Sequence, residues 1–156
     1  MTISDLGSIG EFVASIGVVI TLIFLASQVR QNTKALKVSS YQEFVSRQIQ
    51  VNDLTANHAE TFVKTQSGEE FSASDEIIHM ARLSSTIRNG DALYYQYQQG
   101  LIDEKRVDSA LMAIAGSIAD DQLGLDIWAL VQNRYDDEYC KAINIILDTK
   151  FEQADA

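Results

Sequence analysis

The stretch from Glu11 to Lys37, EFVASIGVVITLIFLASQVRQNTKALK, decides the fold. Eighteen residues from Phe12 to Val29 carry no charge, and the apolar run extends back to Ile9. A bilayer core about 30 Å thick is crossed by about 20 helical residues. The stretch therefore predicts a transmembrane helix.

A cleaved secretory signal and a buried helix of a soluble domain both fit this stretch less well. A secretory signal begins with Lys or Arg and has a shorter apolar core, whereas the first charged side chains here belong to Asp5 and Glu11. A helix buried in a soluble core needs a sheath of apolar side chains, and the remaining chain is largely polar and acidic.

Positive residues predict the orientation of the span. No Lys or Arg precedes it, and Arg30, Lys34 and Lys37 follow it directly. Such residues remain in the cytoplasm, so we expect the N-terminus outside and the C-terminal domain in the cytoplasm. The three cations share one helix face, where we expect them to act as headgroup anchors.

Small residues line one face of the span. They are spaced alternately three and four apart: Gly7, Gly10, Ala14, Gly17 and Thr21. Helices in lipid associate where small side chains let their backbones approach. We expect this set, called the seam below, to join copies of the chain into a homo-oligomer.

Glu11 is an acid at the edge of the span, where a charge is costly. One interpretation is an interfacial carboxylate near the positive end of its helix. The other is a ring of Glu11 carboxylates that favours cations at the outer mouth of a pore.

The fold class expected for the whole chain is all-α. The sequence contains no proline, the residue that most strongly breaks helices, and no strand or hairpin pattern. We expect three parts: a transmembrane helix over 1–30, an amphipathic stalk over 31–66 and an acidic cytosolic helical domain over 67–156. The stalk is either one long helix or two helices with a kink near residues 53–57.

Capping signals divide the domain into helices. Ser67-Gly68 predicts a helix end, and Ser72 or Ser74 predicts the cap of the next helix. That helix should run to about Gln98, although Gly90 inside it is unfavourable. Asp103 predicts a further cap, and the chain should break again near residues 135–136.

Charge and cysteine content limit the partners. Residues 67–156 carry seven Lys or Arg and seventeen Asp or Glu, so the net charge of −10 lies there. An acidic surface repels phosphate backbones, which argues against nucleic-acid binding. The single cysteine, Cys140, indicates a reducing compartment.

Catalytic and cofactor patterns are not found in the sequence. Glu76-x-x-His79 is one piece of a di-iron motif that needs a second such pair, and the only other histidine is His58. There is no phosphate loop, dinucleotide fingerprint or nucleophile elbow. We expect no catalytic residues, metal or cofactor, and no enzyme activity.

An aromatic and amide segment lies near residue 95. Its tyrosines are Tyr94, Tyr95 and Tyr97. Packing between the helices is one interpretation, and a subunit or partner interface is the other. Arg82 and Arg88, in the same predicted helix, should be paired with nearby acids.

The order LGSIGEFVASIGVVITLIFLASQVRQNTKALK, followed later by YYQYQQGLID, resembles a group of small, uncharacterised bacterial single-span inner-membrane proteins. Members begin with a Gly-rich span and continue into a Gln-x-Arg-Gln-Asn-Thr-like segment, which here is residues 28–33. The resemblance implies a bacterial inner-membrane location and carries no activity.

These observations support three hypotheses on function. The first is a single-pass membrane protein that self-associates through its span and stalk in a structural or interaction role. The second is a small homo-oligomeric cation channel with Glu11 at its outer mouth. The third is a membrane-anchored signalling adaptor whose acidic domain binds a basic cytosolic protein.

Overall fold

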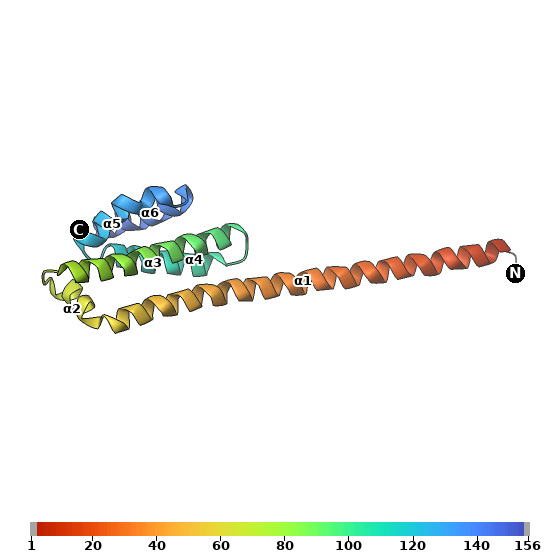
Figure 1. Ribbon diagram of the computed structural model, residues 1–156. Helices are drawn as coiled ribbons and strands as arrows, with labels where there is room; N and C mark the ends of the chain where they lie inside the picture. Colours follow the sequence, from red (N-terminus) through yellow and green to blue (C-terminus); the bar gives the residue numbers. More distant parts are fainter. Residues whose placement is uncertain (1–2, 155–156) are drawn as a thin grey trace. The chain divides into compact units, whose positions relative to one another are not determined.

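The computed structural model describes residues 3–154, with side chains throughout except at 4–6, 66 and 150–154. Within this range the chain forms six α-helices, one 3-10 turn and no strand. The expected all-α class is therefore confirmed (Figure 1). The helices are α1 (Ile3–Asn57), α2 (Ala59–Ser67), α3 (Ala73–Gln98), α4 (Glu104–Ile118), α5 (Gln122–Val131) and α6 (Asp137–Ala154), with η1 (Gln132–Arg134) before α6.

The chain divides into two compact units, residues 1–39 and 40–156. The first unit is the apolar N-terminal part of α1. The second contains the rest of α1 and all later helices. It therefore takes in residues 40–66, which the sequence analysis assigned to the stalk, because Phe44 and Val51 pack into the domain.

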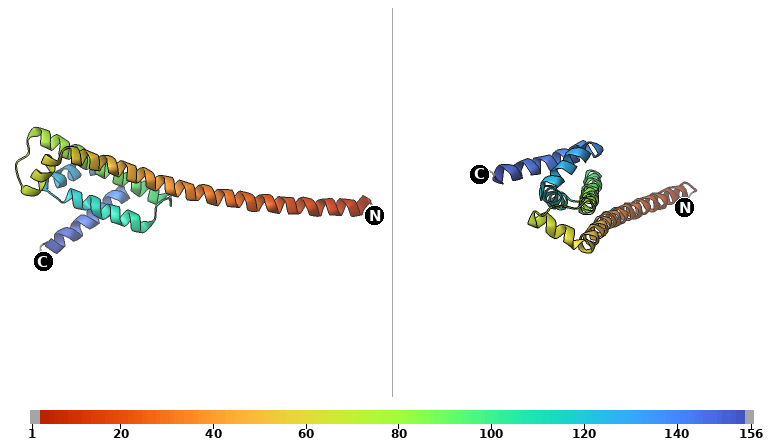
Figure 2. Two further views of the ribbon diagram at one scale, coloured as in Figure 1. Left: turned by 90° about the horizontal axis from the view of Figure 1, so that it is seen from below. Right: turned by 60° about the vertical axis from the view of Figure 1, so that its left-hand side comes forward.

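The domain is built around α4. This helix packs against α3 and α6, while α2 contacts α3, and α5 contacts α3 and α4 (Figures 1 and 2). Its core consists of fully or nearly fully buried side chains from α3 to α6: Leu83, Ile87, Leu93, Ile102, Val107, Leu111, Ile114, Ala115, Ile118, Ile127, Trp128, Tyr139, Ile143 and Leu147.

Helix boundaries follow the capping chemistry of the sequence. Gly68 ends α2 with a φ of 70°, a left-handed conformation that costs glycine little. Ser72 caps α3 in a capping box with Asp75, and Asp103 caps α4. These caps and the break between η1 and α6 agree with the sequence expectations.

Tyr139 of α6 occupies the centre of the core. Its ring contacts Trp128 edge-on, with centroids 6.3 Å apart, and also meets Tyr94. Its hydroxyl donates a hydrogen bond of 3.0 Å to the carbonyl of Ile87 in α3. Burial raises the pKa of this phenol far above its ordinary value. The hydroxyl is therefore a permanent donor.

Gly90 lets Tyr139 approach α3. A Cβ atom at Gly90 would stand 2.6 Å from the Tyr139 hydroxyl and 2.4 Å from Cδ1 of Ile114. Both distances lie well inside normal contact. The glycine that weakened the helix prediction therefore permits the close packing of α3 on α4 and α6.

Gly90→Ala should lower the stability of the domain by about 1–3 kcal/mol, the usual range for overpacking, even though alanine is the better helix former by about 1 kcal/mol. Thermal unfolding of the full chain in mild detergent, followed by circular dichroism, measures this. Ser85→Ala, at an exposed site of the same helix, should change the midpoint little. An unchanged or raised midpoint for Gly90→Ala would contradict the packing described.

Candidate functional site

The first candidate site is the apolar surface of α1. Every described side chain from residue 7 to residue 39 is exposed. Among the residues that the structure describes, one helix is long and apolar enough to cross a membrane, with a mean hydropathy of 2.3 over an 18-residue window in which no residue is buried. This α1 surface has no cover in the described part of the chain.

The predicted seam residues lie in this uncovered part of α1. A Cβ at Gly7, Gly10 or Gly17 would meet nothing within 4 Å, so their backbones are open to a partner. The Thr21 hydroxyl donates to the Gly17 carbonyl at 2.8 Å. Its polar group is thus satisfied within the helix, as a lipid environment requires.

Helix geometry separates two faces of α1. At about 100° per residue, Phe12, Val19 and Ile23 fall opposite the seam. Arg30, Lys34 and Lys37 continue that opposite face and are exposed. Glu11 is exposed and falls beside the seam face. One face of this helix therefore carries small side chains, and the opposite face carries large apolar side chains followed by basic ones.

The tyrosine segment is split by the fold. Tyr94 stacks with Tyr97 at 5.8 Å and with Tyr139 at 5.9 Å, and both Tyr94 and Tyr97 pack against the core. Tyr95 remains 63% exposed. Two of the three predicted interface candidates thus contribute to internal packing, and Tyr95 alone presents most of its ring to the surface.

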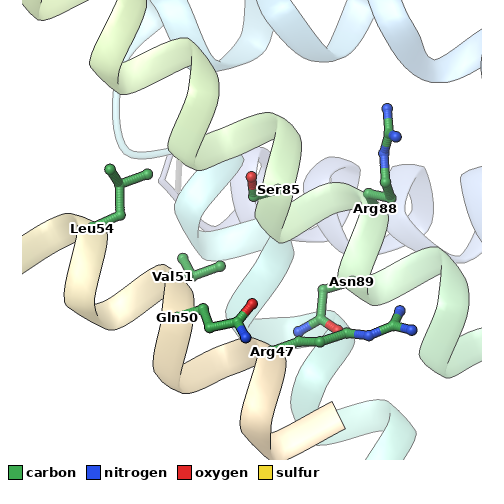
Figure 3. A pocket seen from close by; sticks show the side chains of 7 residues that line it. All are labelled: Arg47, Gln50, Val51, Leu54, Ser85, Arg88 and Asn89. Carbon is green, nitrogen blue, oxygen red and sulfur yellow. The ribbon is translucent and has the colours of Figure 1, made fainter. Parts of the chain in front are cut away.

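A pocket of about 230 Å³ lies between the C-terminal part of α1 and α3 (Figure 3). Its lining combines the apolar Val51 and Leu54 with the polar side chains of Gln50, Ser85 and Asn89. Arg47 and Arg88 also line it, but Figure 3 shows the Arg88 guanidinium turned away from the other side chains. Arg47 is paired with Glu43. The charges therefore do not converge on one point.

Asp75 is the centre of a polar network that joins α2 to α3. One carboxylate oxygen accepts from the Thr61 hydroxyl at 2.8 Å, and the other accepts from Lys64 Nζ at 2.6 Å. The Ser72 hydroxyl and backbone N–H also donate to Asp75. These donors, led by Lys64, hold the pKa of Asp75 well below its usual range. The network fixes the corner between the two helices.

Arg82 differs from its predicted pairing. It is buried in α3, and its guanidinium lies over the Phe62 ring of α2, 4.3 Å from the centroid. It forms no ion pair with any residue that the structure describes. Asp120 and Asp121 are the acids that raise its pKa against a larger lowering by burial. A cation–π contact thus takes the place of the expected salt bridge.

His79 lies one turn before Arg82 and is almost completely buried. Its Nε2 atom is 3.4 Å from Oδ2 of Asp121. In the sequence, His79 forms a Glu-x-x-His pair with Glu76, which is one piece of a di-iron motif whose second pair is missing. Within residues 3–154 no group of three or more His, Cys, Asp or Glu side chains is placed to hold a metal ion, and Glu76 is exposed. The pairing of His79 with Asp121, 42 positions apart, left no local signal.

No family model matches the chain, and neither a curated protein nor a solved structure matches it. The resemblance to small bacterial inner-membrane proteins therefore stays a prediction. The candidate sites stand on the residues and the geometry described above.

Proposed function

We propose that this chain is a single-pass membrane protein that self-associates through the seam and displays an acidic helical domain in the cytoplasm, in a structural or interaction role. The observation that carries the proposal is the uncovered apolar surface of α1. Soluble monomers rarely expose contiguous apolar patches of more than a few hundred Å².

The free energy gained by burying the exposed apolar side chains of α1 is large enough to favour their insertion into lipid. Twelve large apolar side chains between residues 9 and 29 are each 43% or more exposed. Burying them is worth on the order of 20 kcal/mol at about 1.5–3 kcal/mol each. That exceeds the whole stability of a typical domain, about 5–15 kcal/mol. A chain left with this surface in water would aggregate.

Polar groups within the proposed span are compatible with lipid. The Ser15 hydroxyl donates to the Phe12 carbonyl at 2.7 Å, and Thr21 is bonded in the same manner. The unbroken helix satisfies its own backbone groups. Arg30, Lys34 and Lys37 follow on the face opposite the seam, where long cationic side chains reach lipid headgroups.

The two faces give the span a basis for self-association. Helices in lipid gain little from contact between large apolar side chains, because lipid tails are equally apolar. Close approach of backbones is favoured on the side of Gly10, Ala14 and Gly17. The side of Phe12, Val19 and Ile23 then faces lipid.

The orientation of the proposed span is measured by labelling single cysteines in spheroplasts with a membrane-impermeant maleimide. Ile3→Cys and Met112→Cys, both at exposed positions, are placed separately in a Cys140→Ala background. We expect Ile3→Cys to react in intact spheroplasts and Met112→Cys to react only after permeabilisation. The opposite pattern contradicts the orientation, and release of the protein by an alkaline wash contradicts the span.

Gly10→Leu combined with Gly17→Leu should shift the chain from oligomer to monomer, because two bulky side chains prevent backbone approach. A loss of about tenfold in association constant corresponds to about 1.4 kcal/mol and is measurable by native mass spectrometry in mild detergent. Val19→Leu on the opposite face is the matched control and should leave the stoichiometry unchanged. If the double variant keeps the wild-type stoichiometry, the seam is not the interface.

A further inference from the structure

Three ionisable side chains meet where α3 passes the turn between α4 and α5. His79 and Arg82 come from α3, and Asp121 comes from the turn. His79 is 1% exposed and Arg82 is 8% exposed. Together they form what we call the polar cluster, and it plays no part in the membrane function proposed above.

Several atoms of the polar cluster are buried without a hydrogen bond to any residue that the structure describes. They are Nδ1 and Nε2 of His79, Nε and Nη2 of Arg82, and Oδ2 of Asp121. Although His79 Nε2 and Asp121 Oδ2 are 3.4 Å apart, the two atoms are not placed to form a hydrogen bond. Buried polar atoms in this condition are rare, and each costs about 1–3 kcal/mol. The cluster therefore contains five of the six buried side-chain atoms that lack a hydrogen bond among the described residues.

The surroundings of His79 favour its neutral form. Arg82 faces it from its own helix, Asp120 and Asp121 face it from the α4–α5 turn, and the Phe71 ring covers it at 5.5 Å from the loop before α3. Burial lowers the pKa of His79, and Arg82 lowers it further, whereas the two aspartates raise it by less.

We propose that His79 is a proton-binding site that makes the domain acid-sensitive. When the imidazole takes up a proton, the loop over 68–71 moves and the Phe71 side chain separates from the His79 ring. The imidazolium is then exposed to water. The proton adds to the imidazole and no other bond changes. The result is a reversible opening of the loop over 68–71, beside the corner that the Asp75 network fixes between α2 and α3.

The loop over 68–71 is the side of the polar cluster that yields most easily. Gly68, Glu69 and Glu70 are exposed, and Phe71 is only half-buried. On the other side, Asp121 caps α5 by accepting from the Gly124 N–H at 2.6 Å. Opening that side would cost a helix cap.

The sign of the pH effect follows from linkage. A histidine whose pKa is lowered in the closed form binds fewer protons there than in the open form. The closed form therefore keeps its full stability above an ordinary histidine pKa of about 6.5. It loses stability as the pH falls through that value toward the lower pKa of the closed form.

Hydrogen–deuterium exchange of the full chain in mild detergent at pH 7.5 and pH 5.5, corrected for the intrinsic exchange rate, tests the proposal. We expect amides of the loop and of the first turns of α3 to exchange faster at pH 5.5. The ceiling is about tenfold, because pH 5.5 lies one unit below the ordinary histidine pKa. Amides of α4 and α6 should not change.

The chain offers a matched control, because His58 is its only other histidine and lies in the turn between α1 and α2. His79→Gln should abolish the pH difference, and His58→Gln should leave it intact. An unchanged exchange pattern in the wild type, or a pH difference that survives His79→Gln, would overturn the proposal.

A second measurement needs no substitution at His79. The wild-type chain labelled with ¹³C-histidine gives two histidine ring signals, and His58→Gln identifies which one belongs to His79. We expect the His79 signal to titrate below an ordinary histidine pKa of about 6.5 and to move together with backbone signals of Phe71. Titration of His79 at or above an ordinary histidine pKa, or without a change at Phe71, would refute the proton-linked opening.

Discussion

The apolar surface of residues 9–29 needs a cover that the described part of its own chain does not supply. This constraint orders the first unit of the molecule. If this surface is covered by lipid, as proposed, the helix has to be unbroken, because exposed backbone groups are not tolerated in lipid. Its few hydroxyls have to bond within the helix, as Ser15 and Thr21 do. Cationic side chains follow the apolar run, at the end where the proposed span would meet headgroups and water.

The second unit differs from the first because it buries its own apolar core. Tyr139 connects α6 to α3 through one buried hydrogen bond, and Gly90 provides the space for the ring. Asp75 connects α2 to α3 through a satisfied polar network. The polar cluster of His79, Arg82 and Asp121 contrasts with that network, because it is equally enclosed but poorly hydrogen-bonded. The Asp75 network therefore holds the corner between α2 and α3 rigidly, whereas the polar cluster makes the neighbouring loop over 68–71 sensitive to protons.

Much of the fold was predictable because it depends on local chemistry. The absence of proline, the capping residues Ser72 and Asp103, and the helix end at Gly68 each act within a few residues, and the structure agrees with them. The extent of the domain was not predictable in this way. Residues 40–57 resemble a free amphipathic helix in sequence, and their place in the domain becomes visible only in the structure, where Phe44 packs against the core and Val51 is buried.

The side chains that define the interior sites depend on contacts between distant segments. Gly90 is a weak point in a predicted helix until the ring of Tyr139 is placed above it. Arg82 is expected to be one half of an ion pair, yet its guanidinium lies over an aromatic ring on α2. His79 and Asp121 meet only after α3, α4 and α5 have packed. The local sequence pattern does not predict such contacts between residues that are distant in the sequence.

The most direct test of the account is a spin-label accessibility scan along residues 8–30 in liposomes, in a Cys140→Ala background. A single span predicts that a water-soluble nickel complex is excluded from the middle of the stretch. Self-association through the seam predicts that oxygen reaches labels at Phe12, Val19 and Ile23 more readily than labels near the seam, at Leu25 and Gln28. Nickel access to the middle of the stretch would contradict the span, and uniform access of oxygen around the helix would contradict the association.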